Sequence, residues 1–162
     1  MTKLFKIALA TFAAMTMAAN AQEIQRNDEG TNFYSTIEVP ANADQLFVSG
    51  KGPRAVNPDA PIAERTYGDT GTQARSTFNS IKAAVEKAGW SMSDIVMVRV
   101  YLVADPEMGK MDFAGFNKAY QEFFGTGENP NKPVRAVVEI SGLAVPGWLV
   151  EIDVRGARMP AM

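Results

Sequence analysis

The amino-acid sequence predicts one α+β domain with the element order β-β-α-β-α-β-β. Short runs of β-branched and apolar residues, several with alternating polarity, are typical of strands. Two longer segments carry apolar residues at spacings of three and four, the pattern of helices that pack on a sheet. No internal repeat or shift in composition divides the chain. We therefore expect a mixed sheet with both helices on one face.

Residues 1–21 have the parts of a secretory signal peptide. Two lysines precede an uncharged apolar run, and Ala19-Asn20-Ala21 has the small-residue pattern of a cleavage site. The apolar run is too short to span a bilayer. We therefore expect a mature domain at residues 22–162 and a periplasmic or secreted location, with no membrane contact after cleavage.

The composition excludes several kinds of chemistry. The chain has no cysteine and no histidine, which excludes a thiolate nucleophile, an imidazole base and the commonest zinc sites. The leader carries two of the 16 Lys and Arg residues and none of the 18 Asp and Glu residues, so the mature chain has a net charge of −4. This charge argues against nucleic acid or an anionic membrane surface as a partner. Catalysis would depend on carboxylates, arginine, lysine, hydroxyls and water, and no metal is expected.

The first part of the mature chain predicts a hairpin followed by a long loop. Residues 22–31 are polar and lack periodicity, so we expect them to fray. Residues 33–39 and 45–49 are typical of two strands joined by a proline-containing turn. Residues 50–55 match the dinucleotide-binding pattern G-x-G-x-x-A, but the prolines that follow prevent a helix from starting there, so no cofactor is expected. Residues 51–71 are then either a binding loop or a variable surface insertion.

Two helices and a central strand are expected in the middle of the chain. The first helix is predicted at residues 72–88, and the second at 113–124 after the N-cap Asp112, with aromatic residues as its buried stripe. Residues 95–103 between them are apolar on both faces, apart from Arg99. Such a strand lies inside a sheet that is covered on both sides.

Two helices of this size cover only one face of the predicted sheet. The strand at 95–103 requires cover on the other face as well, and the sequence predicts no third helix. We therefore expect a homo-oligomer that buries the second sheet face between subunits.

The last predicted strands carry charges that could do chemistry. Residues 133–154 are typical of an antiparallel strand pair with a bend that contains glycine and proline. Arg135 lies in the first strand and Glu151 in the second. The two side chains form either a binding and proton-transfer site or a cross-strand ion pair that faces water. The bend at Leu143 decides whether Arg135 faces Glu151 or Asp153.

Several short motifs occur in a specific order between about residues 34 and 157. They are Ser49-Gly50, Thr72-Gln73-Ala74-Arg75, Lys87-Ala88-Gly89, Asp94-Ile95-Val96, Tyr101-Leu102, Phe116-Asn117-Lys118-Ala119-Tyr120, Phe123-Phe124, Pro133-Val134-Arg135 and Val150-Glu151-Ile152-Asp153. Each motif alone is weak, but together they make the mature chain resemble the Rid/YjgF family of reactive-intermediate deaminases, here as an exported member.

The resemblance implies a homotrimer of a chorismate-mutase-like α+β fold. It also implies hydrolysis of 2-imino or 2-enamino acids to 2-keto acids and ammonia in clefts between subunits, without a cofactor. The family's substrate-anchoring arginine corresponds to Arg135, whose planar fork suits the carboxylate of a small-molecule substrate. Its water-activating glutamate corresponds to Glu151. The resemblance further implies a catalytic Tyr34 and substrate binding by Gly50 and Asn117.

Four features depart from the usual family pattern. Val137 stands where many members have cysteine, Lys51 where glutamine is usual, and Asn32-Phe33 where Gly-Pro precedes the tyrosine; the loop at 51–71 is also longer. By the resemblance, these positions lie around the cleft, so the identity of the substrate stays open. Two other functions stay open, a periplasmic protein that binds small carboxylates without turnover and a holdase-like structural trimer.

Overall fold

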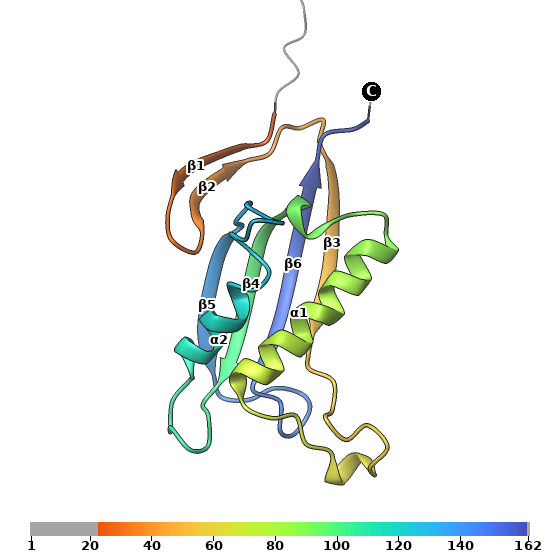
Figure 1. Cartoon of the computed structure of the whole chain (residues 1–162), viewed down its shortest axis with the longest axis vertical. Helices are drawn as coiled ribbons and strands as arrows, with labels where there is room; N and C mark the ends of the chain where they lie inside the picture. The colour runs from red at the N-terminus through yellow and green to blue at the C-terminus, as the bar shows by residue number, and fades with distance from the viewer. Residues whose placement is uncertain (1–22, 162) are drawn as a thin grey trace, which may run out of the picture.

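The structure, a computed structural model, describes residues 23–161. The predicted signal peptide lies outside these residues. Within them the chain has six strands, two α-helices and two short 3-10 helices (Figure 1). In chain order they are β1 (Gln25–Glu29), β2 (Tyr34–Glu38), β3 (Asp44–Lys51), η1 (Ile62–Glu64), α1 (Thr70–Lys87), η2 (Met92–Asp94), β4 (Ile95–Val103), α2 (Phe113–Tyr120), β5 (Val134–Ile140) and β6 (Val150–Arg158).

The main sheet is mixed and has the strand order β3-β6-β4-β5. Strand β6 pairs antiparallel with β3 and β4, and β5 pairs in parallel with β4. Strands β1 and β2 form a separate antiparallel hairpin beyond the end of the sheet where β5 starts (Figure 1). Lys132, just before β5, fixes the hairpin because its Nζ donates to Glu29 Oε1 (2.8 Å) and to Gly30 O (3.0 Å).

Both α-helices lie on one face of the main sheet, as predicted (Figure 1). Helix α1 starts after Asp69, whose Oδ1 accepts a hydrogen bond from Thr72 N (2.7 Å), and this bond lowers the pKa of Asp69. Helix α2 starts after the predicted N-cap Asp112, which accepts from Gly115 N (2.8 Å). None of the helices within residues 23–161 is long and apolar enough to cross a membrane.

The core fills the space between the helices and the sheet. The Phe78 ring of α1 lies 6.2 Å from the Phe116 ring and 6.0 Å from the Tyr120 ring, measured between centroids. All three side chains are fully buried, which confirms that the aromatic stripe of α2 is core. Phe113 is the exception, because its side chain is 42% exposed at the start of α2.

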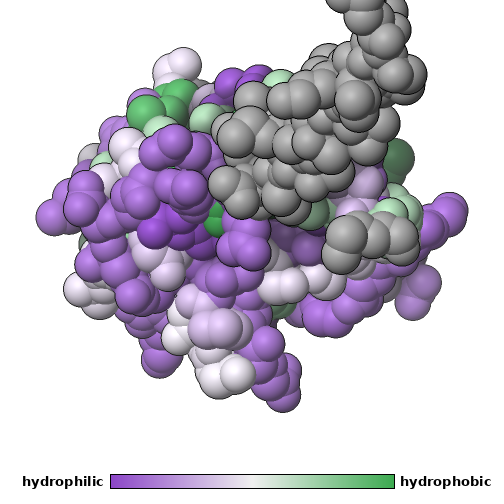
Figure 2. Space-filling model, turned by 90° about the horizontal axis from the view of Figure 1, so that it is seen from above, coloured by the Kyte–Doolittle hydropathy of each residue, from purple (hydrophilic) through white to green (hydrophobic). Residues whose placement is uncertain are grey.

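The sheet face opposite the helices is open in the single chain. Strand β4 buries Val98, Val100 and Leu102 under the helices, and the residues that alternate with them are half-buried or exposed. Phe47 is 64% exposed and Val138 45% exposed on this open face. Figure 2 looks onto the hairpin end and shows a mostly hydrophilic surface with hydrophobic residues gathered at its upper edge. Strand β4 is therefore internal, as predicted, but covered on one side only.

Three predictions about strands were wrong. Residues 22–31 contain strand β1, which the sequence hides because its cross-strand bonds are polar: Asn27 Nδ2 donates to Thr36 Oγ1 (3.4 Å) and Glu38 Oε1 (3.2 Å). Strand β2 therefore pairs with β1, and β3 joins the main sheet. Strands β5 and β6 are not neighbours either, since β4 lies between them.

Candidate functional site

Arg135 lies near the start of the edge strand β5, level with Val98 of β4, so its side chain is on the face that carries the helices. Four aromatic rings surround its guanidinium. The carbon Cζ lies 4.5 Å from the ring centroid of Tyr120, 5.5 Å from that of Phe33, 5.6 Å from that of Phe116 and 5.8 Å from that of Phe113. Burial among these groups lowers the pKa of Arg135, but an arginine stays protonated. The group is therefore a partly desolvated cation.

Asn117 of α2 orients this cation. Arg135 Nη1 donates a hydrogen bond to Asn117 Oδ1 (2.8 Å). Within residues 23–161 no Asp or Glu oxygen lies within 4.0 Å of the guanidinium. A guanidinium has five N–H donors, so most of them remain available. A half-buried cation that no carboxylate neutralises is suited to bind an anion, and its planar fork favours a carboxylate.

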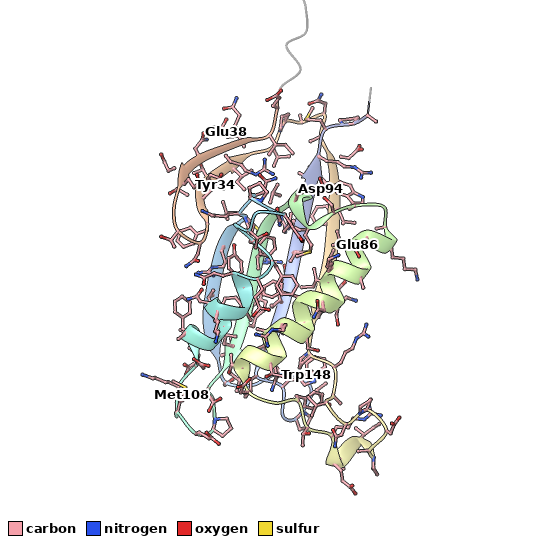
Figure 3. All side chains as sticks on the ribbon, viewed as in Figure 1. Tyr34, Glu38, Glu86, Asp94, Met108 and Trp148 are labelled. Atoms are coloured by element: carbon pink, nitrogen blue, oxygen red, sulfur yellow. The ribbon has the colours of Figure 1, made fainter. Side chains whose placement is uncertain are left out.

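Tyr34 does not reach Arg135. It begins β2 and lies near Arg26 of β1, where burial lowers the pKa of Arg26 and Tyr34 partly offsets that effect. Because consecutive strand residues point in opposite directions, the neighbouring Phe33 takes the place over the guanidinium. Figure 3 shows Tyr34 on the hairpin at one end of the molecule. Its predicted catalytic role remains a prediction.

Glu151 and Gly50 form a second cluster. Glu151 is level with Tyr101 of β4, on the open face of the sheet. Its carboxylate covers Gly50, where a Cβ would collide with Glu151 Oε1. The pairing of β3 with β6 is irregular between Val48 and Lys51, and this bulge brings the Gly50 backbone against the carboxylate. No hydrogen bond or ion pair involves the Glu151 carboxylate within the described part of the chain, so its oxygens are available to water or a ligand.

The buried Gln73 of α1 holds the segment that leads to Glu151. Its Nε2 donates to Gly68 O (2.9 Å) and Gly147 O (3.0 Å), and its Oε1 accepts from Leu149 N (2.7 Å). This role of Gln73 was not predicted from the sequence. A signal was present, because a glutamine at a position of the apolar helix stripe needs hydrogen-bond partners when buried.

Trp148 connects the same segment to the long loop. Its ring covers Gly52, where a Cβ would collide with it, and meets the Tyr67 ring edge-on at 6.3 Å between centroids. The loop is itself ordered by Asn57, whose Oδ1 accepts from Thr66 N (2.8 Å). Figure 1 shows the loop at the end of the molecule opposite the hairpin, and Figure 3 shows Trp148 toward the same end. The long loop therefore adjoins the Glu151 cluster and not Arg135.

The two clusters do not meet within one chain. Val98 and Tyr101, which are level with Arg135 and Glu151, point to opposite faces of β4. The two clusters also lie three residues apart along β4, Arg135 level with Val98 and Glu151 level with Tyr101. Of the two alternatives, the cross-strand ion pair is wrong, since Arg135 pairs with neither Glu151 nor Asp153 within residues 23–161, and Asp153 pairs with Arg99 Nε at 2.9 Å. A site that uses both clusters requires two copies of the chain.

Within residues 23–161, no group of three or more acidic side chains is arranged to hold a metal ion. One cluster contains an oriented guanidinium, and the other contains a carboxylate that no other side chain or backbone group of the described residues binds. The first can bind a carboxylate, and the second can accept and return a proton.

Comparisons with known proteins agree with the resemblance drawn from the motifs. The family model described as Endoribonuclease L-PSP matches residues 27–157. A RutC family protein of Pyrococcus horikoshii is 39% identical over 108 residues, which cover 67% of this chain and 75% of that protein. The 2-iminobutanoate/2-iminopropanoate deaminase of Escherichia coli is 36% identical over 100 residues, 62% of this chain and 70% of that protein.

Solved structures share the fold. A protein of unknown function from the conserved Rid family of Yersinia pestis has a TM-score of 0.65 at 19% identity and covers 85% of this chain and 100% of its own. A YjgF family member from Neisseria meningitidis has a TM-score of 0.54 at 21% identity and covers 87% of this chain and 99% of its own. Such a likeness concerns the fold alone, and it confirms the predicted α+β class.

Proposed function

The chain belongs to the Rid/YjgF family, and on that premise we propose that it hydrolyses 2-imino or 2-enamino acids to 2-keto acids and ammonia. The observation that supports this proposal most is the guanidinium of Arg135, which is half-buried, oriented by Asn117 and free of carboxylates within residues 23–161. A substrate acid group would supply the missing negative charge.

In the proposed reaction, Arg135 holds the substrate carboxylate through paired N–H···O bonds. The imine carbon next to this carboxylate is already electrophilic, so binding mainly has to place a water molecule about 3 Å from it. Asn117 keeps the guanidinium plane fixed during this step, because its amide oxygen occupies one Nη1 hydrogen.

Glu151 would move the proton. Its carboxylate takes a proton from water as the water oxygen bonds to the carbon of the protonated imine, which gives a neutral carbinolamine. Glu151 then returns that proton to the nitrogen. The C–N bond breaks, ammonia leaves, and the hydroxyl proton passes to the Glu151 carboxylate as the carbonyl of the 2-keto acid forms. Glu151 releases this proton to solvent, so one water is consumed for each ammonia released.

We propose that the site is completed in clefts between the subunits of a homotrimer. The Arg135 cluster of one subunit would face the Glu151 cluster of the next, because a single chain separates them. The open sheet face, with Phe47 and Val138 well exposed, supplies apolar surface for this assembly. Light scattering on the purified mature protein should give the mass of a trimer. A stable monomer under assay conditions would remove the proposed cleft.

Turnover is tested with 2-iminopropanoate generated in situ by an amino acid oxidase, with semicarbazide to capture the imine that remains. The mature protein should lower the amount captured and raise the rate of 2-keto acid formation. If it binds pyruvate in calorimetry without this effect, the protein is a carboxylate binder.

The endoribonuclease description of the family is a poorer guide to the function of this chain. A net charge of −2 for the whole chain gives no attraction to the RNA backbone.

Gly50→Ala should reduce turnover with little effect on folding. The added Cβ takes the space of the Glu151 carboxylate, and misplacement of a catalytic group by about 1 Å can cost on the order of 100-fold. Steady-state kinetics and thermal unfolding measure the two effects. Gly127→Ala is the matched control, because a Cβ there meets nothing within 4 Å. Equal kcat in both variants would contradict the role of the Glu151 cluster.

We also propose that the chain is exported and cleaved after Ala21. The small residues of Ala19-Asn20-Ala21 follow an uncharged apolar run, which is the order that a signal peptidase requires. N-terminal sequencing of protein secreted to the periplasm or medium should begin at Gln22. Retention of residues 1–21 on the folded protein would contradict the proposal.

A further inference from the structure

Two half-exposed phenylalanines rim the guanidinium of Arg135. Phe33 and Phe113 are each 42% exposed, although their ring centroids lie 5.5 Å and 5.8 Å from Cζ. The other two rings, those of Phe116 and Tyr120, are fully buried. Of the four rings around the cation, two are thus buried in the core, and the other two, Phe33 and Phe113, form a half-exposed apolar rim.

Hydrogen bonds to the neighbouring residue, Asn32, hold Phe33 in place. Tyr120 Oη donates to Asn32 O (2.7 Å), and Gln121 Nε2 donates to Asn32 Oδ1 (2.9 Å). These bonds attach the turn of the hairpin to α2. The Phe33 ring therefore lies over Arg135 before any ligand arrives, which lowers the entropic cost of packing against it.

Phe113 is held in a similar way. It is the first residue of α2, directly after the cap that Asp112 forms with Gly115 N (2.8 Å). Large apolar side chains that are fixed in half-exposed positions beside a charged group are typical of ligand-binding surfaces. If an acid binds to the guanidinium through its carboxylate, the first atoms of its side chain would lie at about the same distance from the guanidinium as the rings of Phe33 and Phe113.

We propose that the acid bound by Arg135 carries an apolar and preferably aromatic side chain, which packs against Phe33 and Phe113. This inference rests on the proposed function and specifies its substrate class as imino acids of the size of phenylalanine or leucine. A charged or strongly polar substituent would lose water against the two rings and gain no hydrogen bond from them.

Calorimetry with two stable acids tests the inference without turnover. Propanoate and 3-phenylpropanoate share a carboxylate, and only the second has a ring. We expect 3-phenylpropanoate to bind the mature protein about tenfold more tightly, the effect of burying roughly half of a phenyl ring. Phe33→Ala should lower its affinity by more than that of propanoate. Ile62→Ala, which removes an exposed apolar side chain of the long loop, should change neither.

The outcomes separate this inference from the proposed function. Equal affinity of the wild-type protein for the two acids would overturn the inference and leave imine hydrolysis untouched. Binding of neither acid would instead contradict Arg135 as the carboxylate anchor. If Phe33→Ala changes the oligomeric state but not the ratio of affinities, the ring is a subunit contact and the inference fails. Phe33→Leu keeps an apolar side chain and replaces the alanine variant if that variant does not fold. Its ratio of affinities for 3-phenylpropanoate and propanoate should lie between those of the wild-type protein and Phe33→Ala.

Discussion

Arg135→Ala is expected to remove most or all of the imine hydrolysis by the mature protein. The guanidinium is half-buried and has no carboxylate partner within residues 23–161, so a bound substrate would be its counter-ion. Removing one member of a desolvated charge pair costs about 2–5 kcal/mol, which corresponds to roughly 30- to 5,000-fold in kcat/KM. Steady-state kinetics measure this loss, and calorimetry with propanoate should show loss of binding.

Two further variants separate charge from geometry. Arg135→Lys keeps the charge but loses the planar fork and the bond to Asn117 Oδ1, so it should recover only part of the rate. Arg75→Ala is the matched control, because Arg75 of α1 forms an exposed pair with Glu122 in the turn after α2. Thermal unfolding should remain cooperative in all three variants. An Arg135→Ala protein that retains the wild-type rate would end the assignment.

The helices and the central strand could be predicted because their signals are local. Ala74, Phe78, Ile81 and Val85 repeat at helical spacing and are buried, and β4 occupies residues 95–103 as predicted. Helix α2 ends at Tyr120, earlier than the predicted residue 124. Helix ends depend on capping and tertiary contacts, so they are less certain than helix positions.

Strand pairing could not be predicted because it depends on non-local contacts. The alternation in β5 and β6 indicates two strands, but it does not reveal that β5 pairs in parallel with β4. Strand β1 lacked any hydrophobic pattern, since it pairs through polar side chains at the edge of the domain. Polar edge strands have little apolar surface to bury and so leave little trace in a sequence.

The site residues were predicted individually, and their separation was not. The structure joins Arg135 to Asn117 and Glu151 to Gly50, two pairs that lie far apart in the sequence. It does not join Arg135 to Glu151. The strand register decides which face of the sheet each side chain is on, and only the folded sheet defines that register. Gln73 was missed for a related reason: its partners Gly147 and Leu149 lie more than 70 residues away in the sequence.

Glu151→Gln is expected to retain carboxylate binding and lose turnover. Glutamine has nearly the same shape but cannot take a proton from water, and general acid–base catalysis contributes about 10²–10⁴-fold. We therefore expect kcat to fall by that factor while the affinity for 3-phenylpropanoate stays close to the wild-type value. Asp153→Asn is the matched control, because it removes a neighbouring carboxylate that is already paired with Arg99. An unchanged kcat in Glu151→Gln would mean that another group carries out the proton transfer.

Mixing the two inactive variants tests whether the clusters act across subunits. In a trimer with Arg135 from one subunit and Glu151 from the next, each mixed assembly of Arg135→Ala and Glu151→Gln chains contains one cleft with both native residues. Random co-assembly should therefore restore about a quarter of the wild-type activity. A site within one chain would give no recovery, since every chain would lack one of the two groups. Recovery after co-refolding, with none after simple mixing of preformed assemblies, would place Arg135 and Glu151 in one catalytic cleft.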